Sequence, residues 1–214
     1  MTIPAPALIR AVGRSRFLGQ IAGVGSTSGV RIVVGNWADS PLGSFGDAMV
    51  ELPGGHRILL APSGAVANFI AATYSFDEIR VEPFDLVDDG STWSIRSASL
   101  HLDFEVGRRT WLGALLRLVP RAVAHAPRWI SLIDLIARLV LRGVRVAGET
   151  VNGRKEWYGA TDNRVVTSLA GTFDGRDLGS LETVEPSPRF GFSSTPPRPS
   201  VTRICTTVEV PVGG

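Results

Sequence analysis

The sequence has few of the residues that build metal centres or disulfide frameworks. It contains one cysteine, Cys205, and three histidines, His56, His101 and His125. A single cysteine cannot form an internal disulfide, and the histidines lack the close spacing of a metal-binding helix. We therefore predict no metal and no cofactor. A chain without disulfides is typical of a reducing compartment, which predicts a cytoplasmic protein.

Charge of one sign and long hydrophobic runs are also scarce. The 22 basic and 20 acidic residues leave a net charge of +2, and aromatic side chains do not alternate with basic ones as in single-strand binders. The longest apolar run, over 129–141, includes Asp134 and Arg138 and is too short to cross a bilayer. The first 17 residues show no signal-peptide pattern. We predict no nucleic-acid partner and no membrane span.

Apolar material for a core is plentiful. Hydrophobic residues make up 44 % of the chain and charged residues 20 %, which is ordinary for one globular domain. Residues 1–28 are small, glycine-rich and weakly patterned, so we predict an N-terminal arm there. Residues 29–214 are predicted to form a single β-barrel-like domain with a helical insertion over about 110–143.

Alternating apolar positions predict strands along most of this domain. Two short apolar runs flank Pro53-Gly54-Gly55 and predict a hairpin. Residues 92–106 alternate but slip phase once, which predicts one long strand with a β-bulge near Ser97. Further strands are predicted over 30–34, 78–82, 144–158, 164–170 and 201–210, with a turn at 173–175.

Helices are predicted in two places. Ser63 can cap a short helix that extends to about Thr73. A helical pair follows the long strand, with one helix over 111–119 and a second, mostly apolar helix over 128–142 that Gly143 ends. These elements together predict a mainly β (α+β) protein, with a curved antiparallel sheet or barrel and an inserted helical pair.

The densest cluster of polar and aromatic residues lies at 152–159. Lys155, the only lysine of the chain, follows Arg154, and an amine beside another cation loses proton affinity and becomes a nucleophile for carbonyl compounds. Trp157 and Tyr158 are candidates for contacting a ligand and for handling a proton. The alternative is a solvated or salt-bridged pair, because strand neighbours point to opposite faces and nearby glutamates can neutralise both cations.

A second segment carries a family resemblance. The stretch Asp39-Ser40-Pro41-Leu42-Gly43-Ser44-Phe45, followed by Val50-Glu51-Leu52-Pro53, resembles the S-P-x-G…E-x-P segment of acetoacetate-decarboxylase-like β-barrel proteins. In that family a lysine forms a Schiff base with a β-keto acid, and buried glutamates and an arginine shape the pocket. The resemblance implies that Glu51 is a pocket carboxylate, and the family's lysine stretch is loosely echoed around Lys155.

Other residues are also candidates for contacts with a ligand. The proline-rich loop 185–200 is predicted to cover a pocket with Phe190 and Phe192. His101 begins a polar row that either lines a barrel interior or faces solvent. The middle of the chain is basic, which suits an anionic head group or a phosphate but equally suits a solvated surface. Its arginines are Arg108, Arg109, Arg117, Arg121, Arg128, Arg138, Arg142 and Arg145.

We therefore predict a barrel that binds a small molecule, either apolar or a carbonyl (β-keto) compound. If the protein is an enzyme, we expect a decarboxylase or another lyase or cyclase. In that reaction Lys155 or Arg154 would stabilise negative charge, and Glu51 or Tyr158 would handle a proton. The alternative is a non-catalytic interaction protein whose apolar helix 128–142 forms a homo-oligomer interface or lies on a membrane surface.

Overall fold

The computed structural model describes residues 13–117, 147–149, 155–191 and 195–210. The main strands are β1 (Gly13–Ser26), β2 (Arg31–Asp39), β3 (Phe45–Glu51), β4 (Arg57–Ala61), β5 (Glu78–Val81), β6 (Phe84–Asp88), β7 (Thr92–Ser97), β8 (Leu100–Arg109), β10 (Lys155–Phe173) and β13 (Ser200–Val210). The short strands are β9 (Ala147–Glu149), β11 (Arg176–Asp177) and β12 (Leu181–Glu182), and the helices within these ranges are α1 (Gly64–Ala71) and α2 (Trp111–Leu116).

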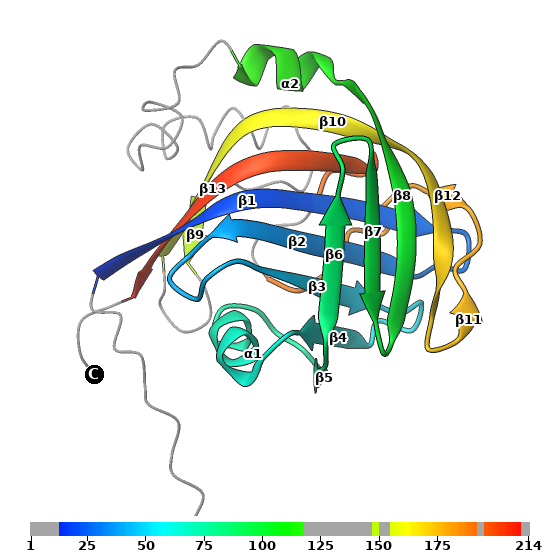
Figure 1. The fold of residues 1–214 in the computed structure, drawn as a ribbon, viewed down its shortest axis with the longest axis horizontal. Helices are drawn as coiled ribbons and strands as arrows, with labels where there is room; N and C mark the ends of the chain where they lie inside the picture. Colours follow the sequence, from blue (N-terminus) through cyan, green and yellow to red (C-terminus); the bar gives the residue numbers. More distant parts are fainter. Residues whose placement is uncertain (1–12, 118–146, 150–154, 192–194, 211–214) are drawn as a thin grey trace, which may run out of the picture.

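All of these strands belong to one curved sheet (Figure 1). The main strands lie side by side in the order β5-β4-β3-β2-β1-β13-β10-β8-β7-β6. Neighbours are antiparallel except β4 and β5, which are parallel and are connected through α1. The sheet curls into a half-barrel, which confirms the predicted mainly β fold with a curved sheet.

Apolar side chains cover both faces of the sheet, because successive residues of a strand point to opposite sides. On β2, Ile32 and Val34 join a large buried cluster with Trp93 and Phe104 of β7 and β8. This cluster fills the inside of the half-barrel, where β6, β7 and β8 curl across β1, β2 and β3 (Figure 1). α1 packs on the opposite face, against a smaller cluster on β4.

Several local predictions are confirmed. β3 and β4 form the predicted hairpin around Pro53-Gly54-Gly55. Ser63 caps α1, and its side chain accepts a hydrogen bond from the backbone N–H of Val66. β9 and the start of β10 lie within 144–158, where strand structure is predicted as either a pair or one interrupted strand, and the two pair with each other. Asp174 and Gly175, both with positive φ, make the predicted turn between β10 and β11.

The predicted bulge near Ser97 is wrong. Residues 92–106 form two antiparallel strands, β7 and β8, joined by a tight turn. The Ser97 hydroxyl accepts a hydrogen bond from the backbone N–H of Leu100 at 3.0 Å, and the backbone N–H of Ser99 donates to Glu82 at 3.0 Å. A turn and a bulge both shift the phase of an alternating pattern, so periodicity alone did not distinguish them.

Residues 13–26 differ from the expected arm, because they form β1 in the middle of the sheet, between β2 and β13. Their small residues permit close backbone packing, since a Cβ on Gly19 would collide with the carbonyl oxygen of Asn36. Pairing on both sides overrides the weak strand propensity of this segment. Residues 164–170 also differ, because they continue β10 rather than form a separate strand. The predicted helix 128–142 lies outside the described residues.

Thr110 caps α2, the helix that borders the cavity described below. Its hydroxyl accepts a hydrogen bond from the backbone N–H of Gly113 at 3.0 Å and donates to the side chain of Asn163 at 2.8 Å. Thr110→Ala is expected to lower the free energy of unfolding by about 1 kcal/mol, because the first turn loses its acceptor. Urea denaturation measures this loss. Thr110→Ser keeps the hydroxyl, and an equal loss in both variants would contradict the capping role.

Candidate ligand-binding cavity

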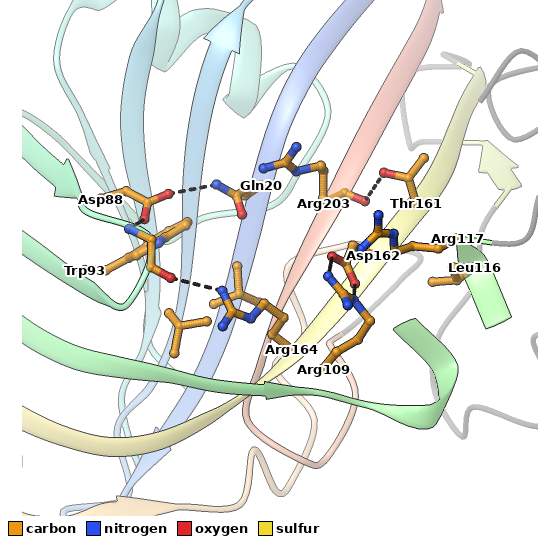
Figure 2. Close-up of a pocket in the computed structure, with 13 residues that line it drawn as sticks. Gln20, Asp88, Trp93, Arg109, Leu116, Arg117, Thr161, Asp162, Arg164 and Arg203 are labelled. Carbon is orange, nitrogen blue, oxygen red and sulfur yellow. Dashed lines mark hydrogen bonds and ion pairs between the residues drawn. The ribbon is translucent and has the colours of Figure 1, made fainter. Parts of the chain in front are cut away.

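A cavity of about 500 Å³ opens at one end of the half-barrel interior (Figure 2). One wall comes from β1, β13 and β10, the other from β6, β7 and β8, and α2 borders it. Small-molecule sites typically measure about 300–1,000 Å³, so this volume suits a ligand. The lining residues are Gln20, Asp88, Gly90, Trp93, Val106, Arg109, Leu116, Arg117, Thr161, Asp162, Arg164, Val201 and Arg203.

The base of the cavity is apolar. Trp93, Val106 and Val201 are buried and belong to the cluster that fills the half-barrel. Because alternate residues of β13 point to the same face, Arg203 follows Val201 on the interior side. The interior therefore changes within two residues from packed core to polar cavity.

Arg109 and Asp162 form a two-pronged ion pair on one side of the cavity. The Nε and Nη2 atoms of Arg109 donate to the two carboxylate oxygens of Asp162 at 2.6 and 2.9 Å. Partial burial raises the pKa of Asp162, but hydrogen bonds from Arg109 and the backbone N–H of Asn163 outweigh it and hold that pKa below its ordinary value. Asp162 is therefore ionised, and it neutralises Arg109.

Arg164 is held by backbone carbonyl groups instead of a carboxylate. Its Nε donates to the carbonyl oxygen of Gly107 and its Nη1 to that of Gly90, both at 3.0 Å. The nearby carboxylate of Asp88 is used locally, because it accepts from Gln20 and from the backbone N–H of Gly90, both at 2.8 Å. The guanidinium of Arg164 is thus fixed in position while its charge stays available to a ligand.

Arg117 and Arg203 bring two more positive charges to the rim. Both side chains are exposed, and neither belongs to an ion pair within the part of the chain that the structure describes. Four arginines therefore stand against two aspartates in this cavity, as Figure 2 shows. The resulting net positive charge favours an anionic ligand.

Metal-ligand clusters and membrane-spanning helices are both missing from the part of the chain that the structure describes. Within residues 13–117, 147–149, 155–191 and 195–210, no three histidine, cysteine, aspartate or glutamate side chains come together as metal ligands would. In the same ranges, no helix combines the length and apolar character that crossing a membrane requires.

Of the predicted catalytic residues, Glu51 and Tyr158 are described, and neither lines this cavity. Glu51 ends β3 and is buried against Arg31. Tyr158 of β10 lies beneath α1 on the other face of the sheet, where its hydroxyl is hydrogen-bonded to that of Tyr74. Lys155 is the first residue of β10, but its side chain lies outside the described part, as does all of Arg154.

The predicted ligand-binding residues are also dispersed. Phe190 is buried, with its ring centroid 5.8 Å from that of Phe76. Trp157 is half-buried on β10, and it faces the side of the sheet opposite to that of the next residue, Tyr158. His101 is exposed on β8, so the polar row that it begins faces solvent. Phe192 lies outside the described residues.

The sequence pattern did not single out Arg164 and Arg203, because alternation alone does not show which face of a strand points inward. The signal was available in 201–210, where Val201 and Arg203 share one face while the apolar residues from Ile204 onward occupy the other. An arginine two residues after a buried valine indicates the point where that strand face leaves the packed core, because burying an unpaired charge is costly.

Similarity to known proteins is limited to solved structures, since no protein-family model and no curated protein matches the sequence. An acetoacetate decarboxylase from Legionella pneumophila matches over 98 % of this chain and 90 % of its own, with 9 % identity and a TM-score of 0.41. A second acetoacetate decarboxylase structure matches over 98 % and 92 %, with 10 % identity and a TM-score of 0.43.

A putative AttH protein from Nitrosomonas europaea matches over the whole of this chain but only 59 % of its own length, with 12 % identity and a TM-score of 0.33. The chain thus resembles acetoacetate decarboxylases weakly, and the resemblance noted in the sequence is confirmed at that level.

Proposed function

We propose that this protein binds a small organic anion, a carboxylate with an apolar or carbonyl-bearing body, in the arginine-lined cavity. The supporting observation is the excess of arginine around an apolar base in a cavity of about 500 Å³. Guanidinium groups bind carboxylates through charge-assisted hydrogen bonds, often in pairs. The body of the ligand would lie on Trp93, Val106 and Val201.

Arg164 is the proposed main contact. Two backbone carbonyl groups already hold its guanidinium, so little side-chain freedom remains to be lost when an anion binds. Arg117 and Arg203 are exposed and would mainly attract the anion and speed its association. Arg109 is expected to contribute less to anion binding, because its Nε and Nη2 atoms already donate to the carboxylate of Asp162.

Arg164→Gln is expected to weaken the binding of benzoate about tenfold to a hundredfold, because a charge-assisted hydrogen bond is lost. Isothermal titration calorimetry with benzoate and with benzamide measures this effect, since the two probes share a shape and differ in charge. Benzamide is expected to bind the unchanged protein much more weakly than benzoate.

The matched control is Arg176→Gln, which removes an exposed arginine on β11, outside the cavity. It is expected to leave benzoate binding unchanged. Equal binding of benzoate and benzamide, or equal losses in the two arginine variants, would contradict the proposal. Native mass spectrometry of freshly purified protein adds a probe-free test, since a small acidic molecule present only in the native state would be the natural ligand.

The carbonyl chemistry of Lys155 and Arg154 stays a prediction, because it concerns side chains outside the described residues. The interaction surface predicted for helix 128–142 stays a prediction for the same reason.

A further inference from the structure

A second, smaller cavity lies on the opposite face of the sheet, beneath α1. Its volume is about 50 Å³. One water molecule needs about 10–15 Å³ by the same kind of measure, so the space suits roughly four non-hydrogen atoms. Aromatic side chains make up much of its lining, among them Phe17, Trp37, Phe45 and Phe69.

Thr206 of β13 brings an unsatisfied hydroxyl to this cavity. The residue is 4 % exposed, and its Oγ1 has no hydrogen-bond partner among the described residues. A buried hydroxyl without a partner costs about 1–3 kcal/mol, and most buried polar atoms in proteins have one. Thr206 is therefore suited to bind a molecule that enters the cavity.

Asp47 of β3 supplies a second polar group. Its Oδ1 accepts a hydrogen bond from the indole Nε1 of Trp37 at 2.9 Å, and no described residue donates to its Oδ2. Gly35 makes this arrangement possible, because a Cβ at that position would collide with both the Asp47 carboxylate and the Trp37 indole. Burial raises the pKa of Asp47 to about 7, although the Trp37 hydrogen bond lowers it.

The cavity has no group that would hold an anion. No lysine, arginine or histidine occurs among the described residues that line it. Tyr74, which follows α1, and Tyr158 of β10 hydrogen-bond to each other through their hydroxyls and so connect two sides of the cavity. The free hydrogen-bonding capacity is thus concentrated at Thr206 and Asp47.

We propose that this cavity is a second binding site, for a small uncharged molecule that carries one hydroxyl or carbonyl group on a short apolar chain. The polar group would meet the Thr206 hydroxyl and the Asp47 carboxyl, and the chain would contact the surrounding aromatic rings. This proposal is independent of the anion site, because the two cavities lie on opposite faces of the sheet and one would bind an anion, the other an uncharged molecule.

The test uses 2-propanol, which has four non-hydrogen atoms, as the probe. Its titration into nitrogen-15-labelled protein is followed at the indole N–H signal of Trp37, which Trp37→Phe identifies by its absence. We expect this signal to shift to saturation. Thr206→Val keeps the side-chain shape without the hydroxyl, and we expect it to weaken binding about tenfold, whereas Thr206→Ser is expected to retain binding.

A linear shift without saturation, or equal binding by Thr206→Val and the unchanged protein, overturns the proposal. A crystal soaked in 2-propanol decides the same question without a variant. Electron density for the alcohol within hydrogen-bond distance of Thr206 Oγ1 supports the site, and ordered water alone in the cavity overturns it.

Discussion

Glu51→Gln is expected to lower the free energy of unfolding by about 3–5 kcal/mol. Glu51 is 2 % exposed, and its carboxylate oxygens accept from Arg31 Nη2 at 2.9 Å and from the backbone N–H of Arg189 at 2.7 Å. A glutamine side chain has one carbonyl oxygen in place of two carboxylate oxygens. Its NH₂ group would therefore face either the Arg31 guanidinium or the backbone N–H of Arg189, and both of these are donors. Arg31, itself 5 % exposed, would be left as a buried charge with no carboxylate to neutralise it, although its Nη2 also donates to the carbonyl oxygen of Leu52 at 3.3 Å. Urea denaturation at neutral pH measures the loss.

The control is Glu78→Gln, which breaks an ion pair with Arg80 at the surface, where the expected loss is much smaller because solvent screens the two charges. Replacing both partners of the buried pair, as Arg31→Met with Glu51→Leu, is expected to recover much of the loss because no buried charge remains. A loss in Glu51→Gln no larger than that in Glu78→Gln would contradict the structural role and favour the predicted pocket role.

Glu51 also shows what a local pattern can predict and what it cannot. The family resemblance implied that Glu51 is a pocket carboxylate, and the structure places it among the most buried side chains of the described residues. Its partners were not predictable, because Arg31 and Arg189 are 20 and 138 residues away in sequence. Strand pairing and a loop contact bring the three together, and neither appears in periodicity.

The cavity shows the same limit more strongly. Alternation predicted most strands and the hairpin around Pro53-Gly54-Gly55, because each depends on neighbouring residues. The arginine-lined cavity is built from six strands and one helix between Gln20 and Arg203. Its shape follows from the order of strands in the sheet, which places β1 beside β13 and β10 beside β8. Strand order is set by packing across the whole chain, so the sequence pattern showed the elements and not the site.

Asp47 is expected to make the protein less stable as the pH rises from about 4 to 7. Its pKa is raised to about 7 in the folded protein, against an ordinary value of 3.8 for the unfolded chain. Between these values the folded state binds the proton more tightly, so raising the pH costs folding free energy, at about 1.4 kcal/mol per pH unit. The total comes to about 4 kcal/mol, of which about 3 kcal/mol falls between about pH 4.5 and 7.

Asp47→Asn should remove this dependence while it keeps an acceptor for the Trp37 indole. The measurement is the free energy of unfolding of both proteins in urea across this pH range, and the difference between them subtracts every other titrating group. The stability of the variant relative to the unchanged protein should rise by about 3 kcal/mol from about pH 4.5 to 7. Asp85→Asn, at an exposed position on β6, should instead follow the unchanged protein. Parallel curves for Asp47→Asn and the unchanged protein would show that the Asp47 carboxyl is already ionised in the fold, and that its cavity is wetter than its burial indicates.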